Sequence, residues 1–450
     1  MKINNIIDRR EFIKKLGKHS SKLLIGGYVL DSVLFNPQDA MADIVANVYV
    51  AKNGTPIENV SKVFDMKYGG IENFIGSDDV VVINPNGQWT NQGGSNCACC
   101  MGLIDIILNR PGGFDGEIIF AECTQFQSNG YWNATGSGLD RNGPYNFNDM
   151  ILHYQGNGHS NVNGIRIRRN SDNPDDWPVI SSPSEGQGWI RPEWVSPTSD
   201  CVFYLPYPVI RSPYSNRLIN LKHGVYDNNV LTPTNLKFIK MPNLNNHGFN
   251  GDQDYAGVTS AVKSFLGIAE LEGDYHGPFS DGHKNMHTYG DFCHGNSSEE
   301  RAFAAGEAAG GWMNICRKPD VFLTTAEWVG WEGRFGPGAA NVKTVGLADD
   351  PSTLDYYMSK YVMWPTHPEQ QYFNPDYNVG TNKTRLTING CISQGFGTAN
   401  ESEIAAFVYD FNSPTVSRQQ IDQMIKLFKE DQASQQDVLD LIDLYNSGGK

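Results

Sequence analysis

The sequence predicts an α/β protein: a mostly parallel sheet flanked by helices, with a loop-rich β insertion and a C-terminal helix pair. Apolar runs at residues 79–83 and 117–122 are typical of strands that are buried on both faces of a parallel sheet. Between them, residues 101–109 carry apolar side chains at helical spacing. This β-α-β order is the repeating unit of α/β folds.

We divide the predicted core into two parts, residues 43–123 and residues 236–412. The first part opens with a strand at residues 48–51 and a short helix at residues 57–69. The helix is predicted because two valines and Phe64 share one face, and a glycine pair ends it. The strands and the helix predicted in the second part lie at residues 236–241, 320–325, 343–348 and 353–362.

Residues 124–235 have a different composition, dense in Asn, Gly, Ser, Pro and Trp and with few helical periods. Isolated strands are predicted at residues 164–168 and 201–205. We interpret this segment as a loop-rich insertion. Asn-rich loops with exposed aromatic side chains can bind glycans, but Asn side chains more often only hold turns, so both interpretations stay open.

Residues 413–450 predict an antiparallel pair of helices. Ser417 to Gln420 form a capping box, and the apolar residues that follow share one face. A second helix with the same spacing opens at Ser434. The pair would either pack on the core or dock a partner.

The first 42 residues predict a twin-arginine export signal. Residues 8–14 (DRREFIK) nearly match the twin-arginine motif, an apolar run follows at residues 23–30, and Ala-Met-Ala at residues 40–42 fits a cleavage site. The alternative is an amphipathic first helix with an accidental Arg pair. The export interpretation predicts a mature protein in the periplasm or outside the cell.

Composition and missing motifs exclude several functions. The chain has 35 Lys and Arg against 50 Asp and Glu, a net charge of −15, which argues against a nucleic-acid partner. It has no apolar run of roughly 18 residues, so we predict no integral membrane span. It also lacks the G-x-S-x-G elbow, the phosphate-binding P-loop and the H-E-x-x-H zinc motif.

Three of the eight cysteines stand together as Cys97, Cys99 and Cys100. Such a run could be half of a metal site or a redox pair. Because a helical apolar pattern continues after it, the run could instead be the buried start of a helix, or could form disulfides.

Five local patterns occur in a fixed order. They lie at residues 79–86, 118–122, 242–267, 329–337 and 349–355. In order and spacing they resemble the domain of unknown function 362 family, over residues 48–365. The ferredoxin modules often found beside that family imply a redox partner. This chain departs from the family pattern at Asn84, Asn246 and Ser264, and the first two replace lysines, which reduces the positive charge for an anionic ligand.

Four polar residues fall at or just after predicted strand ends: Asn86, Glu122, His247 and Glu332. In an open α/β sheet, ligands bind at the carboxyl ends of the strands, so we expect these residues to line a pocket for a small-molecule ligand.

We assign catalytic roles to His247, Lys263 and Glu332. Lys263 would orient an anionic group, and Glu332 or His247 would move a proton. Asn86, Glu122 and Asp355 would contact the substrate, although Asp355 stands where a helix cap or a first-turn charge is also expected.

Half of the ten histidines lie within 48 residues, beginning at His247. Imidazole binds divalent transition metals, so we predict a metal site. Its ligands would be His276, His283, His287 and His294. Because several glycines interrupt the segment, a polar surface loop with scattered histidines is the alternative.

Two functional hypotheses follow. The first is an exported metal-dependent or redox enzyme that acts on a small molecule. The second is a non-catalytic extracytoplasmic binding protein that uses the tryptophans of the insertion, such as Trp132, to hold a glycan or a surface partner.

Overall fold

The computed structural model describes residues 23–25, 28–30, 46–123, 130–170, 174–199, 201–247, 257–270, 279–286, 297–334 and 336–413. The chain divides into two units. In the first, a short antiparallel hairpin joins β1 (Leu23–Ile25) to β2 (Tyr28–Leu30). The rest of the predicted export signal and nearly all of the predicted C-terminal helix pair lie outside the described residues.

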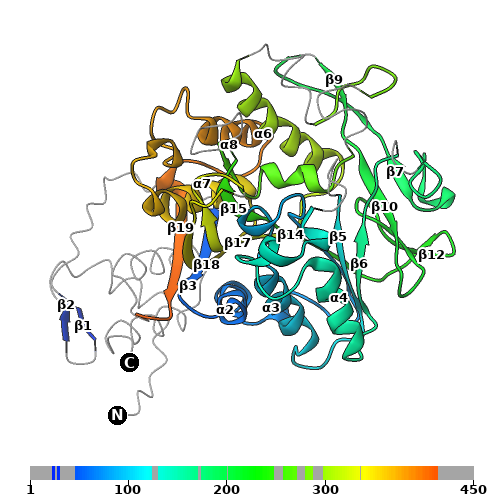
Figure 1. Cartoon of the computed structure of the whole chain (residues 1–450), viewed down its shortest axis with the longest axis horizontal. Coiled ribbons are helices and arrows are strands. Elements are labelled where there is room, and N and C mark those ends of the chain that lie inside the picture. The colour runs from blue at the N-terminus through cyan, green and yellow to red at the C-terminus, as the bar shows by residue number, and fades with distance from the viewer. Residues whose placement is uncertain are drawn as a thin grey trace. The chain divides into compact units, whose positions relative to one another are not determined.

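A ten-stranded mixed sheet forms the centre of the second unit (Figure 1). Its order along the sheet is β19 (Ile404–Asp410), β3 (Ala46–Lys52), β18 (Ala340–Ala348), β17 (Val321–Gly330), β14 (Leu236–Met241), β4 (Val80–Pro85), β5 (Glu117–Glu122) and β6 (Val162–Arg166), with β15 (Asn243–Asn246) and β16 (Val258–Thr259) branching from β17. Only β18 and β16 pair antiparallel to their neighbours. The predicted α/β class with a mostly parallel sheet is confirmed.

Both faces of the sheet are buried, as the continuous apolar strands predict. In β4, Val80 and Val82 pack into one core cluster, while Val81 and Ile83 pack into the other. The two clusters are completed by helices on opposite faces (Figure 1). One face carries α2 (Pro56–Tyr68), α3 (Cys97–Leu108) and α4 (Phe147–Gly156); the other carries α6 (Ser298–Ile315), α7 (Pro351–Met358) and α8 (Lys383–Ser393). No helix in the described part of the chain is long and apolar enough to cross a membrane.

The cysteine run is the buried start of α3. Asn96 caps this helix, because its side chain accepts a hydrogen bond from the backbone of Cys99. Burial raises the pKa of the Cys97 thiol to about 12 and those of Cys99 and Cys100 well above their ordinary value. All three cysteines are buried and carry no disulfide, as the predicted buried start of a helix requires.

Helices α6 and α8 pack unusually closely. A Cβ atom on Gly306 of α6 would lie 1.8 Å from the carbonyl oxygen of Thr387, and one on Gly390 of α8 would lie 1.9 Å from that of Phe303. Only glycine fits at these two positions. The two helices meet through small residues and not through an apolar stripe. Hydrophobic periodicity in the sequence therefore does not predict either helix.

The predicted insertion starts later than expected. Strand β6 pairs in parallel with β5, and α4 packs beside it, so residues 147–166 extend the main sheet. The predicted boundary at residue 124 is therefore wrong. The apolar face of α4 was not recognised in the sequence because Asn- and Gly-rich segments flank this short helix. The separate part is an antiparallel sheet of β13 (Val230–Leu231), β12 (Gly224–Asp227), β11 (Leu218–Asn220), β10 (Tyr207–Arg211) and β7 (Gly188–Ile190), with a ribbon of β8 (Glu193–Val195) and β9 (Val202–Tyr204).

Three fully buried glutamates connect this separate sheet to the core. Glu117 of β5 accepts a hydrogen bond from the Ser215 hydroxyl at 2.8 Å. Glu270 forms a two-pronged ion pair with Arg191, at 2.7 and 2.9 Å. Glu307 of α6 accepts hydrogen bonds from the hydroxyls of Ser196 and Thr198, at 2.9 and 2.8 Å.

Candidate functional site

A cavity lies at the carboxyl ends of β4, β5, β15 and β17. It measures about 360 Å³, counted with the solvent at its mouth. Its lining residues are Asn86, Gln88, Trp89, Glu122, Asn245, His247, Thr259, Lys263, Ser264, Leu266, Gly267 and Arg334. The structure therefore brings together Asn86, Glu122, His247 and Lys263, four of the six residues we predicted for the catalytic and substrate-binding site.

Two cationic side chains meet at one imidazole nitrogen in this cavity. The Lys263 ammonium contacts Nε2 of His247, and Nη1 of Arg334 lies 2.8 Å from the same atom. Lysine and arginine only donate hydrogen bonds, so Nε2 of His247 is the acceptor in these contacts. The Arg334 guanidinium also lies over the Trp89 ring, 4.7 Å from its centroid, which fixes its plane.

Glu122 is fully buried at the end of β5. Burial raises the pKa of its carboxyl to about 8, against the opposing effects of the Gly87 N–H group, Lys240 and Arg166. Its Oε1 accepts a hydrogen bond from Gly87 N at 3.1 Å, whereas no described residue hydrogen-bonds its Oε2. At neutral pH the carboxyl therefore carries a proton that it can donate.

Lys240 supports the floor of the cavity. It stands on β14 in register with Asn84 of β4, and its ammonium contacts the Asn84 side-chain oxygen. Its Nζ also lies 2.6 Å from the carbonyl oxygen of Ser264. Burial lowers the pKa of Lys240 well below its ordinary value.

Asp355 is close to the site but does not line the cavity. Its carboxylate accepts hydrogen bonds from the backbone N–H groups of Ala261 and Val262, at 2.7 and 2.9 Å. These residues lead directly into the short helix η6 (Lys263–Gly267), so Asp355 caps the segment that carries Lys263. Burial raises its pKa to about 7. Asp355 is therefore a positioning residue, which differs from the predicted substrate contact.

Glu332 is outside the cavity lining. Its Oε2 accepts a hydrogen bond from Gly338 N at 2.8 Å and closes the turn that follows β17. The residue of this turn that reaches the cavity is Arg334. The predicted catalytic role of Glu332 thus lacks geometric support, because its carboxylate is engaged within the turn and does not line the cavity.

The predicted metal ligands are described only in part. His283 stacks on Tyr204, and its two ring nitrogens face different carboxylates: Nδ1 lies 3.0 Å from Asp281 and Nε2 lies 3.1 Å from Glu193. His276, His287 and His294 lie outside the described residues. Within the described part of the chain, no group of three or more His, Cys, Asp and Glu side chains could hold a metal.

The tryptophans of the insertion are mostly buried. Trp132, Trp177 and Trp189 are 6%, 4% and 0% exposed, and Trp194 packs partly against the core. Glycan-binding aromatic side chains need an accessible face. None of these four offers a fully exposed ring, which weakens the hypothesis of a binding protein.

Sequence reasoning missed the other eight lining residues, among them Trp89, Asn245, Thr259 and Arg334. Arg334 had a detectable signal, since it stands in a Gly-rich turn after a predicted strand. Comparisons with family models, with curated proteins and with solved structures find no match for this chain. The resemblance to the domain of unknown function 362 family therefore stays a prediction.

Proposed function

We propose that this chain binds a small organic anion in the cavity and exchanges a proton with it through Glu122. One observation carries the proposal: Lys263 and Arg334 converge on Nε2 of His247, in a cavity that the buried Glu122 carboxyl, with its pKa raised to about 8, also lines. Two basic side chains thus line one cavity in a chain of net charge −15.

An anion suits this arrangement for electrostatic reasons. Lys263 and Arg334 both line the cavity, so an anionic group that enters it is attracted to them. Lysine and arginine also form the strongest hydrogen bonds with carboxylates and phosphates. His247 would orient both cations rather than transfer the proton, because its Nε2 already accepts from them.

Glu122 is suited to proton transfer because a general acid works best when its pKa is near the working pH. This step uses only side chains of the chain itself, so it fits either the metal-dependent or the redox enzyme that the sequence predicts. We also propose export from the cytoplasm. The disulfide-bonded Cys201 supports export, since disulfides persist in oxidising compartments.

The proposal is tested by calorimetric titration of the whole chain with a panel of small carboxylates, propionate and succinate among them. Lys263→Met should weaken binding about a hundredfold, because it removes a buried charged donor. Lys222→Met is the matched control, since Lys222 is exposed on the insertion, and it should bind as the wild type does. Equal affinity in Lys263→Met and the wild type would contradict the proposal.

A further inference from the structure

We infer that the bound anion carries a hydroxyl group beside its acidic group, so that the ligand is a small hydroxy acid. This inference rests on the proposed function, because it describes the ligand of the same cavity. It starts from two cavity residues, Asn245 and Thr259, that play no part in the cation cluster.

Asn245 and Thr259 face each other across two strands. They are direct partners in the antiparallel pairing of β15 with β16, and both line the cavity. Asn245 is 0% exposed and Thr259 is 5% exposed. No described residue hydrogen-bonds Asn245 Oδ1 or Thr259 Oγ1. Buried polar atoms are nearly always hydrogen-bonded, so two neighbouring exceptions on one cavity wall indicate a ligand group.

One long hydrogen bond favours one of the two orientations of the Asn245 amide. Its Nδ2 lies 3.4 Å from the carbonyl oxygen of Gln92. Exchanging the amide oxygen and nitrogen would set two acceptors against each other. Asn245 therefore presents its oxygen, a hydrogen-bond acceptor, while the Thr259 hydroxyl can donate.

One ligand hydroxyl satisfies both atoms. It donates its proton to Asn245 Oδ1 and accepts the proton of Thr259. An apolar group at this place would leave both buried atoms without a hydrogen bond. An ammonium group would be repelled by Lys263 and Arg334, which line the same cavity.

The acidic group and the hydroxyl belong to one small molecule. The cation cluster and the Asn245–Thr259 pair line the same open-mouthed cavity. Glu122 lines the same space with an Oε2 atom that no described residue hydrogen-bonds. The hydroxy acid would therefore lie within reach of the proton donor.

Matched ligand pairs test the inference by calorimetric titration of the whole chain: propionate against lactate, and succinate against malate. We expect the hydroxylated member of a pair to bind about tenfold more tightly, the effect of a well-placed hydrogen bond. Thr259→Val should reduce this ratio several-fold and leave the affinity for the unhydroxylated member unchanged.

Ser359→Ala is the matched control. Ser359 is another buried residue whose hydroxyl no described residue hydrogen-bonds, but it does not line the cavity. This variant should keep the full preference for the hydroxylated ligand. The comparison of ligands in the wild-type chain needs no variant. It therefore tests the preference for a ligand hydroxyl even if Thr259→Val fails to fold.

The outcomes separate this inference from the proposed function. Equal binding within each pair, with both members weakened by Lys263→Met, would overturn the hydroxyl inference and leave the anion site standing; ordered water would then satisfy the two atoms. If no member of the panel binds at millimolar concentration, both the anion site and the hydroxyl inference fail.

Discussion

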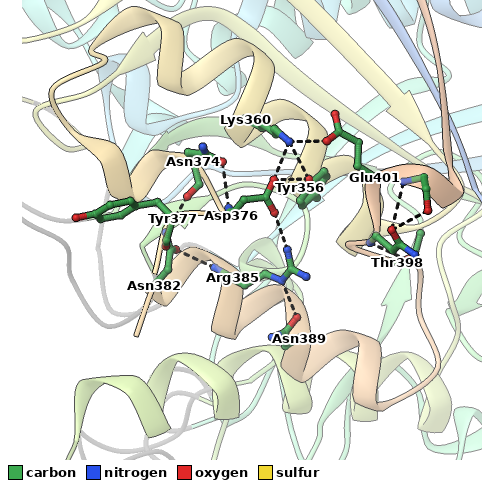
Figure 2. Close-up of polar contacts among 12 residues, drawn as sticks. Tyr356, Lys360, Asn374, Asp376, Tyr377, Asn382, Arg385, Asn389, Thr398 and Glu401 are labelled. Atoms are coloured by element: carbon green, nitrogen blue, oxygen red, sulfur yellow. Dashed lines mark hydrogen bonds and ion pairs between the residues drawn. The ribbon is translucent and has the colours of Figure 1, made fainter. Parts of the chain in front are cut away.

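Two clusters of charged side chains in this protein differ in the groups that their cations contact. In the cavity, Lys263 and Arg334 both contact Nε2 of His247. In a second cluster beside α7 and α8, cations alternate with carboxylates (Figure 2). There Lys360 lies 2.7 Å from Asp376 and 2.6 Å from Glu401. Asp376 also pairs with Arg385 at 3.0 Å and accepts a hydrogen bond from Tyr356 at 2.7 Å.

The pKa shifts in the two clusters have different causes. Burial alone would lower the pKa of Lys360, but hydrogen bonds to Asp376, Glu401 and Tyr356 raise it above its ordinary value. In the cavity, burial dominates and moves Glu122 and Lys240 towards their neutral forms. The network of Lys360, Asp376, Arg385 and Glu401 connects separate segments of the chain, whereas strongly shifted pKa values beside a cavity are typical of a functional site.

The largest expected effect comes from Asp355→Ala. This change leaves two buried N–H groups, those of Ala261 and Val262, without their acceptor. We expect a loss of about 3 kcal/mol in the free energy of unfolding, measured by urea denaturation. Anion affinity should fall too, because the segment that carries Lys263 loses its cap. A variant as stable as the wild type would show that Asp355 does not position this segment.

An intermediate effect is expected from pH. Glu122 is neutral below its pKa of about 8 and negative above it. Its negative form repels a bound anion, so affinity should be constant up to about pH 8 and then fall up to tenfold per pH unit. Titrations across this range check the shape of the curve.

Glu122→Gln is the control for the pH curve, because glutamine keeps the shape of the side chain and does not titrate. Its affinity should stay flat through pH 8. A fall that persists in this variant at the same pH would assign the titration to another group.

The smallest effect is expected in the alternating network. Asp376→Ala removes the shared partner of Lys360, Arg385 and Tyr356. Because these groups are partly exposed, we expect only about 1 kcal/mol less unfolding free energy. Asp227→Ala, at an exposed carboxylate bonded to its neighbour Asn228, should change stability less. Anion affinity should not change in either variant. A loss of affinity in Asp376→Ala would contradict our view that this network has no part in anion binding.

Much of the fold could be predicted from the sequence because buried parallel strands are continuous apolar runs. The strands β3, β4, β5, β14, β17 and β18 all lie where such runs predict them. Helices α6 and α8 could not be predicted, because they pack through glycines such as Gly306 and Gly390 and lack an apolar stripe.

The cavity could be predicted in part for the same reason. Glu122 and His247 come together because strand ends meet at one edge of the sheet. Arg334 and Trp89 were missed because their placement depends on turns, where sequence spacing does not fix direction. Thr259 was missed because β16 has only two residues and no periodicity to read.

Glu117, Glu270 and Glu307 make the insertion inseparable from the core. Each lies fully buried in a core segment and receives donors from residues 191–217, and Glu270 also accepts a hydrogen bond from Asn170 N at 2.8 Å. A chain shortened by residues 191–217 would keep three buried carboxyl groups and lose these donors, at a cost of several kcal/mol. The two parts should therefore unfold in one cooperative transition, and a shortened relative could only persist if all three glutamates had become apolar.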